Sequence, residues 1–123
     1  MDFENIKGAD GSLRISLDVV ASIAKYATLE VDGVDSVSTG NDGIMGLITK
    51  ANYLKAVKIE LVDEVVNAEI NIVVKQGYKI PELSAAIQNN VKNSIQSMTG
   101  LAVARVDIIV VGISRQVEKP TEA

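Results

Sequence analysis

The stretch GYKIPELSAAIQNNVKNSIQSMTG, residues Gly77–Gly100, carries the signals of one complete helix. Pro81 suits the first helical turn, because the N–H that proline lacks would have no partner there, and Gly100 ends the helix. Apolar residues recur between them at steps of three and four, which predicts one buried stripe: Ile80, Leu83, Ile87, Val91, Ile95 and Met98. Valine-rich segments precede and follow this stretch, so we expect the helix to cover a sheet.

A second amphipathic helix is predicted nearer the N-terminus. A short strand at Ser12–Ile15 precedes it, Ser16 caps it, and the turn residues Asp32-Gly33 end it. Its apolar face is predicted to consist of Val20, Ile23, Ala24, Ala27 and Val31, and its polar face of Asp18, Ser22, Lys25, Thr28 and Asp32.

Most of the remaining chain is predicted to form strands. Val34–Thr39 is short and rich in Val, Ser and Thr. Tyr53–Val62 and Ala68–Lys75 alternate apolar and polar residues, which predicts an antiparallel hairpin with its turn at Asp63-Glu64. Ala102–Ile113 is the last and most apolar strand.

The resulting order, β-α-β-β-β-α-β, predicts an α/β (α+β) two-layer sandwich with two helices on one face of a mixed sheet. With 123 residues, the chain has the size of a single domain. We expect a flexible arm over residues 1–11, the domain over residues 12–113 and a disordered tail over residues 114–123.

Composition argues against several classes of function. The chain has no cysteine and no histidine, so a disulfide framework, a thiol nucleophile, a Ser-His-Asp triad and most zinc sites are excluded. The net charge of −4 disfavours binding to a phosphate backbone. We expect a protein that is not an enzyme, with no catalytic residues, no metal and no cofactor. No signal peptide or membrane-spanning run is recognised, so a cytoplasmic location is expected.

The last strand supplies the preferred interface candidates, because it is apolar on both faces. If its even-numbered residues face the helices, then Ile109, Val111 and Ile113 face away from them, together with Val73. Self-association through this surface or along the strand edge is one explanation. Coverage by the chain's own loop is the other.

The loop Gly40–Asn52 is irregular and supplies a second set of candidates: Ile44, Met45, Leu47 and Ile48. These side chains are expected either to contact a partner or membrane or to fold back as satellite core. Three nearby lysines are expected either to favour an anionic partner or simply to be solvated: Lys50, Lys55 and Lys58.

Two other patterns have simple structural explanations. Gly43-Ile44-Met45-Gly46 has the GxxG spacing with which KH domains clamp nucleic acid, but Gly8-Ala9-Asp10-Gly11 has it too, and neither loop carries a basic residue. Four carboxylates could be imagined as an acid/base or metal site, yet their predicted places favour surface or capping roles: Asp63, Glu64, Glu69 and Glu82.

Three stretches resemble the alkaline-shock or general-stress family of Gram-positive bacteria, also labelled envelope stress response proteins. They are GSLRISLDVVASIAKYATLEVDGV, QGYKIPELSAAIQNNVKNSIQSMTGL and VARVDIIVVGI. The middle stretch is the most specific, because it combines Ile80-Pro81-Glu82 with Met98-Thr99-Gly100-Leu101 in register.

This resemblance implies a small non-enzymatic cytoplasmic scaffold protein of the envelope stress response, in some members held near the membrane by an anchored partner. One branch of the family is linked to control of fatty-acid synthesis through protein partners, which is an alternative function. A small nucleic-acid-binding regulator is another. The family supplies no catalytic or cofactor residues to carry over, and the loop at Gly40–Asn52 is less basic than is typical of its members.

Overall fold

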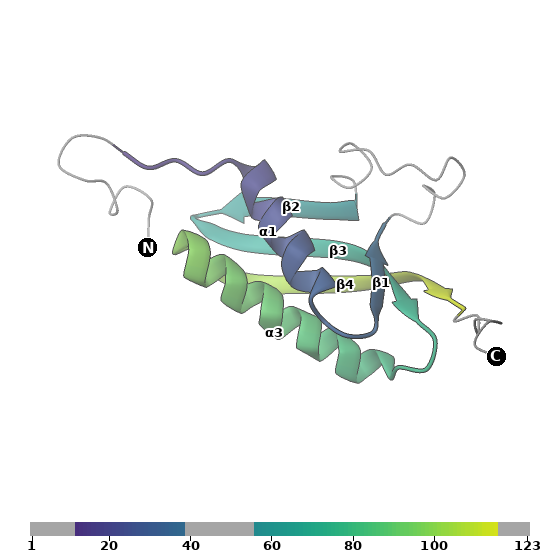
Figure 1. The fold of residues 1–123 in the computed structure, drawn as a ribbon. Coiled ribbons are helices and arrows are strands. Elements are labelled where there is room, and N and C mark those ends of the chain that lie inside the picture. The colour runs from purple at the N-terminus through teal and green to yellow at the C-terminus, as the bar shows by residue number, and fades with distance from the viewer. Residues whose placement is uncertain (1–11, 39–55, 116–123) are drawn as a thin grey trace.

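The computed structural model describes residues 12–38 and 56–115 of the chain, and it contains two helices and four strands in these ranges (Figure 1). In chain order they are α1 (Leu17–Leu29), β1 (Val34–Val37), β2 (Val57–Val62), β3 (Val65–Lys75), α3 (Ile80–Thr99) and β4 (Ala102–Ser114). Both helices lie across the same face of the sheet. The predicted two-layer sandwich is confirmed.

Helix α3 has the predicted ends. Pro81 lies in its first turn, and Gly100 ends it in the left-handed conformation with φ 78°. The buried stripe differs from the prediction at both ends: Ile80 is 39% exposed and Met98 is 69% exposed. Thr99 takes the last buried position instead, because its hydroxyl donates to the Ile95 carbonyl at 2.7 Å and accepts from the N–H after Gly100 at 3.1 Å.

Helix α1 begins as predicted, with the Ser16 hydroxyl oxygen accepting the N–H of Val19 at 3.2 Å. Thr28, which was predicted on the polar face, is fully buried. Its hydroxyl donates to the Ala24 carbonyl at 2.7 Å, so the polar group is satisfied inside its own helix. An amide of α3 joins the two helices, because Asn90 Nδ2 donates to the Ala27 carbonyl at 2.7 Å.

The strand predicted at Ser12–Ile15 does not form, so the observed order begins with α1. Leu13 remains 43% exposed, and Ile15, which packs against the core, is only partly buried. The segment therefore buries too little apolar surface to hold it in the sheet.

Strand β3 forms the centre of a mixed sheet. It pairs antiparallel with β1 at its C-terminal end and antiparallel with β2 at its N-terminal end, and it pairs parallel with β4 along its whole length. Its residues alternate between buried and half-buried from Val65 to Lys75. The buried side faces the helices, where Ile70, Ile72, Ile87 and Ile95 are completely enclosed. Among the described residues, no helix is long and apolar enough to cross a membrane.

Strand β4 is interrupted twice by irregular pairing, between the partners of Val66 and Asn67 and between those of Ile72 and Val73. The second irregularity shifts the alternation that the sequence predicts. Ile113 therefore pairs with the buried Val74 and not with the outward-facing Val73. The prediction that Ile113 shares a face with Ile109 is wrong, because one extra residue in a strand moves the residues after it to the other side.

Candidate functional site

The candidate site is the side of the sheet that faces away from α1 and α3, and we call it the open face. It is built from the outward side chains of β2, β3 and β4, and neither described helix covers it (Figure 1). The face has an apolar end, towards the C-terminus of β3, and a polar end, towards the hairpin of β2 and β3.

The apolar end contains three of the predicted interface residues. Ile109 is 39% exposed and Val111 is 38% exposed. Val73 is half-buried on the neighbouring strand, opposite Gly112. Ile113 is 61% exposed but lies outside this row, at the end of β4. The structure thus brings Ile109 and Val73 to one end of the face, with Val111 as the unpaired residue between Val110 and Gly112, and separates Ile113 from them.

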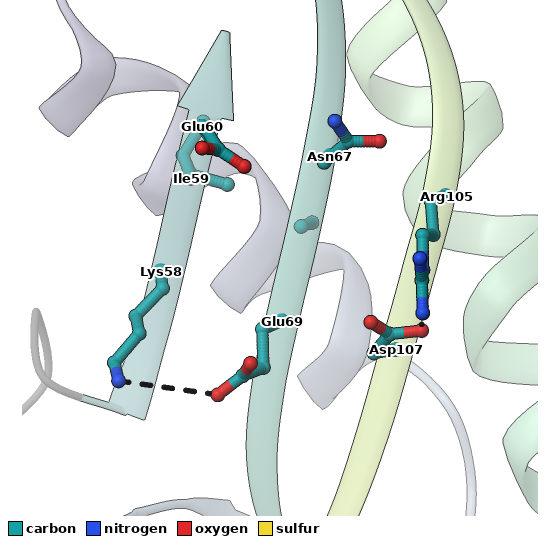
Figure 2. Close-up of a pocket in the computed structure, with 8 residues that line it drawn as sticks. Lys58, Ile59, Glu60, Asn67, Glu69, Arg105 and Asp107 are labelled. Atoms are coloured by element: carbon teal, nitrogen blue, oxygen red, sulfur yellow. Dashed lines mark hydrogen bonds and ion pairs between the residues drawn. The ribbon is translucent and has the colours of Figure 1, made fainter. Parts of the chain in front are cut away.

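The polar end is an open trough of about 480 Å³ lined mainly by charged side chains (Figure 2). Lys58 Nζ lies 4.0 Å from Glu69 Oε2, and Arg105 Nε donates to Asp107 Oδ1 at 3.1 Å. Glu60 adds a further carboxylate. The trough therefore carries three acidic and two basic groups, which is a mixed surface and not one that favours a polyanion.

Most of this charged group was missed from the sequence. The alternation that directs Ile109 outward also directs Asp107 and Arg105 outward, so the signal was present in β4. Lys58 and Glu60 alternate in the same way on β2. The sequence does not show which of these charges lie side by side across the sheet, because this depends on the pairing of the strands.

The four carboxylates considered from the sequence do not converge. Asp63 and Glu64 form the hairpin turn, Glu69 lies on the open face, and Glu82 lies in the first turn of α3. Within the part of the chain that the structure describes, no three such side chains could hold a metal ion. Asp63, Glu64 and Glu69 therefore have surface positions, as predicted, and Glu82 lies where the helix dipole favours a carboxylate.

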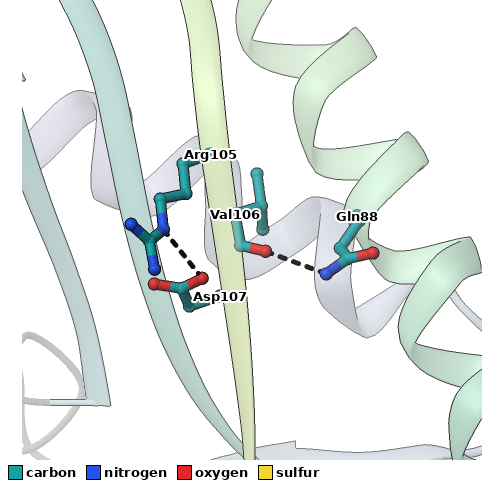
Figure 3. A network of polar contacts seen from close by, with 4 residues as sticks. All are labelled: Gln88, Arg105, Val106 and Asp107. Carbon is teal, nitrogen blue, oxygen red and sulfur yellow. Dashed lines mark hydrogen bonds and ion pairs between the residues drawn. The ribbon is translucent and has the colours of Figure 1, made fainter.

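The free edge of β4 is partly occupied by α3. Gln88 Nε2 donates to the Val106 carbonyl at 3.0 Å (Figure 3), and a groove of about 280 Å³ lies beside it, lined by Asn89 and Lys92 from the helix. Since the side chain takes a backbone acceptor of the edge strand, another strand could not pair at Val106 without displacing it.

The loop candidates lie outside the described residues. These are Ile44, Met45, Leu47 and Ile48, the GxxG segments at 8–11 and 43–46, and Lys50 and Lys55. Their predicted roles stay predictions.

Comparison with known proteins identifies the family. Residues 5–115 match the family of alkaline shock protein 23, which is described as having a cell envelope-related function. The chain belongs to this alkaline-shock family. The resemblance seen in the three stretches of sequence is confirmed by this match.

Relatives extend over most of the chain. It is 34% identical over 105 residues to the uncharacterized protein YqhY of Bacillus subtilis, covering 84% of this chain and 77% of the relative. It is 32% identical over 111 residues to the uncharacterized protein Spy1614 of Streptococcus pyogenes, covering 88% of this chain and 92% of the relative. These relatives support the family and name no activity.

Among solved structures, a variant of the MamM CTD covers 79% of this chain and 98% of its own, at 13% identity and a TM-score of 0.48. This likeness is too distant to carry an inference about function or assembly.

Proposed function

We propose that this alkaline-shock-family chain is a non-enzymatic cytoplasmic protein-interaction component of the cell envelope, which associates with itself and is held near the membrane by a protein partner. The observation that carries the proposal is the apolar end of the open face. Ile109 and Val111 are 39% and 38% exposed, although β-branched side chains in a long strand are usually covered.

The chemistry of the chain supports the non-enzymatic part of the proposal. It has no histidine and no cysteine, which supply most general bases and nucleophiles at neutral pH. Two carboxylates of the open face, Glu69 and Asp107, each form an ion pair with a basic side chain, and their side chains are 40% and 45% accessible. Paired and solvated carboxylates of this kind are better suited to orienting a bound protein than to acid/base catalysis.

Crosslinking in the native cell tests this function. A tagged chain is expressed beside the untagged one, the cells are crosslinked, and membrane and soluble fractions are purified separately. We expect the tagged chain to retain its untagged copy, and to retain an envelope protein in the membrane fraction. A chain that retains neither would contradict the proposal.

The Val111→Lys variant tests the apolar end of the open face in the same experiment. The tagged variant should remain folded but should no longer retain the untagged copy. An unchanged recovery would mean that the apolar end of the open face is not the interface.

A further inference from the structure

The strand pairing arranges the charges of the open face in two rows that run across the sheet. The first row is Lys58, Glu69 and Asp107, because Glu69 pairs with Lys58 on one side and with Asp107 on the other. The second row is Glu60, Asn67 and Arg105, by the same pairing around Asn67. Figure 2 shows both rows crossing β2, β3 and β4.

In each row the two outer strands carry opposite charges. In the first row β2 supplies a cation, Lys58, and β4 an anion, Asp107. In the second row the signs are exchanged, with Glu60 on β2 and Arg105 on β4. If a second copy placed its β4 over β2 and its β2 over β4, every charge on an outer strand would therefore face a charge of opposite sign.

A two-fold axis makes this exchange. We propose that a second copy of the chain packs face to face on the open face, with the two-fold axis parallel to β3. Each β2 then lies over the partner's β4. Lys58 faces the partner's Asp107, and Glu60 faces the partner's Arg105. Symmetry repeats both pairs, so four ion pairs form between the copies.

The apolar end decides the direction of the axis. An axis across the strands would also match the charges, because it would place Lys58 over the partner's Glu60. However, it would turn the apolar end of one copy towards the partner's hairpin at Asp63 and Glu64. An axis along β3 keeps the two apolar ends at the same end of the dimer: Val73 faces the partner's Val73, and Ile109 and Val111 on β4 lie over the side of the partner's sheet that holds β1. Of the two axes, only this one matches the charges without placing an apolar end over the hairpin turn at Asp63 and Glu64.

The charged rows give the contact its orientation, and the apolar end gives it affinity. The side chains of Lys58 and Arg105 are 67% and 68% accessible, so they can reach across the trough without deep burial. The trough of about 480 Å³ leaves room for water between the charged groups. The two Glu69 carboxylates meet at the axis, and each keeps its own Lys58 at 4.0 Å.

This geometry rests on the self-association proposed above, and charge exchange tests it separately. The dimerisation of the full chain is measured by sedimentation for Lys58→Glu, for Asp107→Lys and for their equimolar mixture. In a dimer of either variant alone, residues 58 and 107 carry the same charge and face each other at two places, so dimerisation should weaken about tenfold. In the mixture Glu at 58 meets Lys at 107, and Lys58 meets Asp107, so dimers of one copy of each should form with nearly the affinity of the unaltered chain.

The mixture also distinguishes the two axes. With an axis across the strands, residue 58 would face the partner's Glu60, and residue 107 the partner's Arg105. Two of the four pairs in the mixed dimer would then be repulsive, and mixing would restore little. No restoration on mixing overturns the axis along β3.

Lys79→Glu is the control, because it makes the same charge change on an exposed residue at the start of α3, in the helix layer. It should leave dimerisation unchanged, and an equal weakening would assign the effect to net charge and overturn the proposal. An oligomer that no charge variant affects would overturn the face-to-face geometry and leave self-association standing. A monomeric unaltered chain would refute both.

Discussion

Replacing Val111 by lysine tests the apolar end of the open face. Val111 lies at the second irregularity of β4 and is 38% exposed. Complete burial of such a side chain is worth about 1.5–3 kcal/mol, so covering the exposed 38% contributes about 0.6–1.1 kcal/mol. Each copy contributes one Val111 to a two-fold interface, so the contribution is doubled. Val111→Lys should therefore weaken dimerisation by about 1–2 kcal/mol, or about 5- to 30-fold.

The fold itself should tolerate this change. The lysine can extend along the surface and keep its ammonium group in water, so the free energy of unfolding should change by less than about 1 kcal/mol. Light scattering after gel filtration measures the association, and circular dichroism measures the fold. Leu29→Lys is the control, because Leu29 is equally exposed at 38% but lies on α1.

Two results would refute the reasoning. If Val111→Lys unfolds the chain, then the residue belongs to the core and not to an interface. If it leaves the association constant unchanged, or if Leu29→Lys weakens association equally, then the open face is not the surface that holds the copies together.

Two further predictions concern backbone geometry. Asp63 and Glu64 have φ values of 53° and 65°, so replacing the pair by Asn-Gly should stabilise the hairpin by about 1 kcal/mol; a urea midpoint that does not rise would contradict this. Gly33→Ala should cost about 3 kcal/mol, because φ is 105° and the new Cβ would lie 2.7 Å from the ring of Tyr78. Gly77→Ala, with φ 100° and no atom within 4 Å, should cost only about 1–2 kcal/mol, and equal losses in urea unfolding would show that the contact with the ring does not matter.

The sequence predicted those parts of the fold that depend on local chemistry. The ends of α3 follow from Pro81 and Gly100, and the start of α1 follows from Ser16, because each of these residues acts on its own turn of helix. The hairpin of β2 and β3 follows from regular alternation on either side of a two-residue turn.

Residues were assigned to the wrong face where polarity alone gave the wrong signal. Thr28 and Thr99 have polar side chains, yet each is buried because its hydroxyl donates a hydrogen bond to a carbonyl one helical turn earlier. Met98 is apolar and remains 69% exposed, because the position of Thr99 continues the stripe towards the sheet. Side-chain class predicts burial only when local hydrogen bonding is also considered.

The open face depends on pairing between distant segments, which is why only part of it could be predicted. The irregular pairing after Ile72 moves Ile113 out of the expected row. The local sign of it in β4 is Gly112, because an isolated glycine within a strand often marks a bulge. The two charge rows likewise depend on the register that places Glu69 between Lys58 and Asp107. This register is a property of the assembled sheet.

Sedimentation equilibrium of the unaltered chain over micromolar concentrations tests the central claim of self-association most directly. We expect the average mass to rise with concentration from that of one chain towards that of two. A constant mass of 13.1 kDa throughout this range would contradict the account, because the apolar end of the open face would then remain uncovered by any second copy.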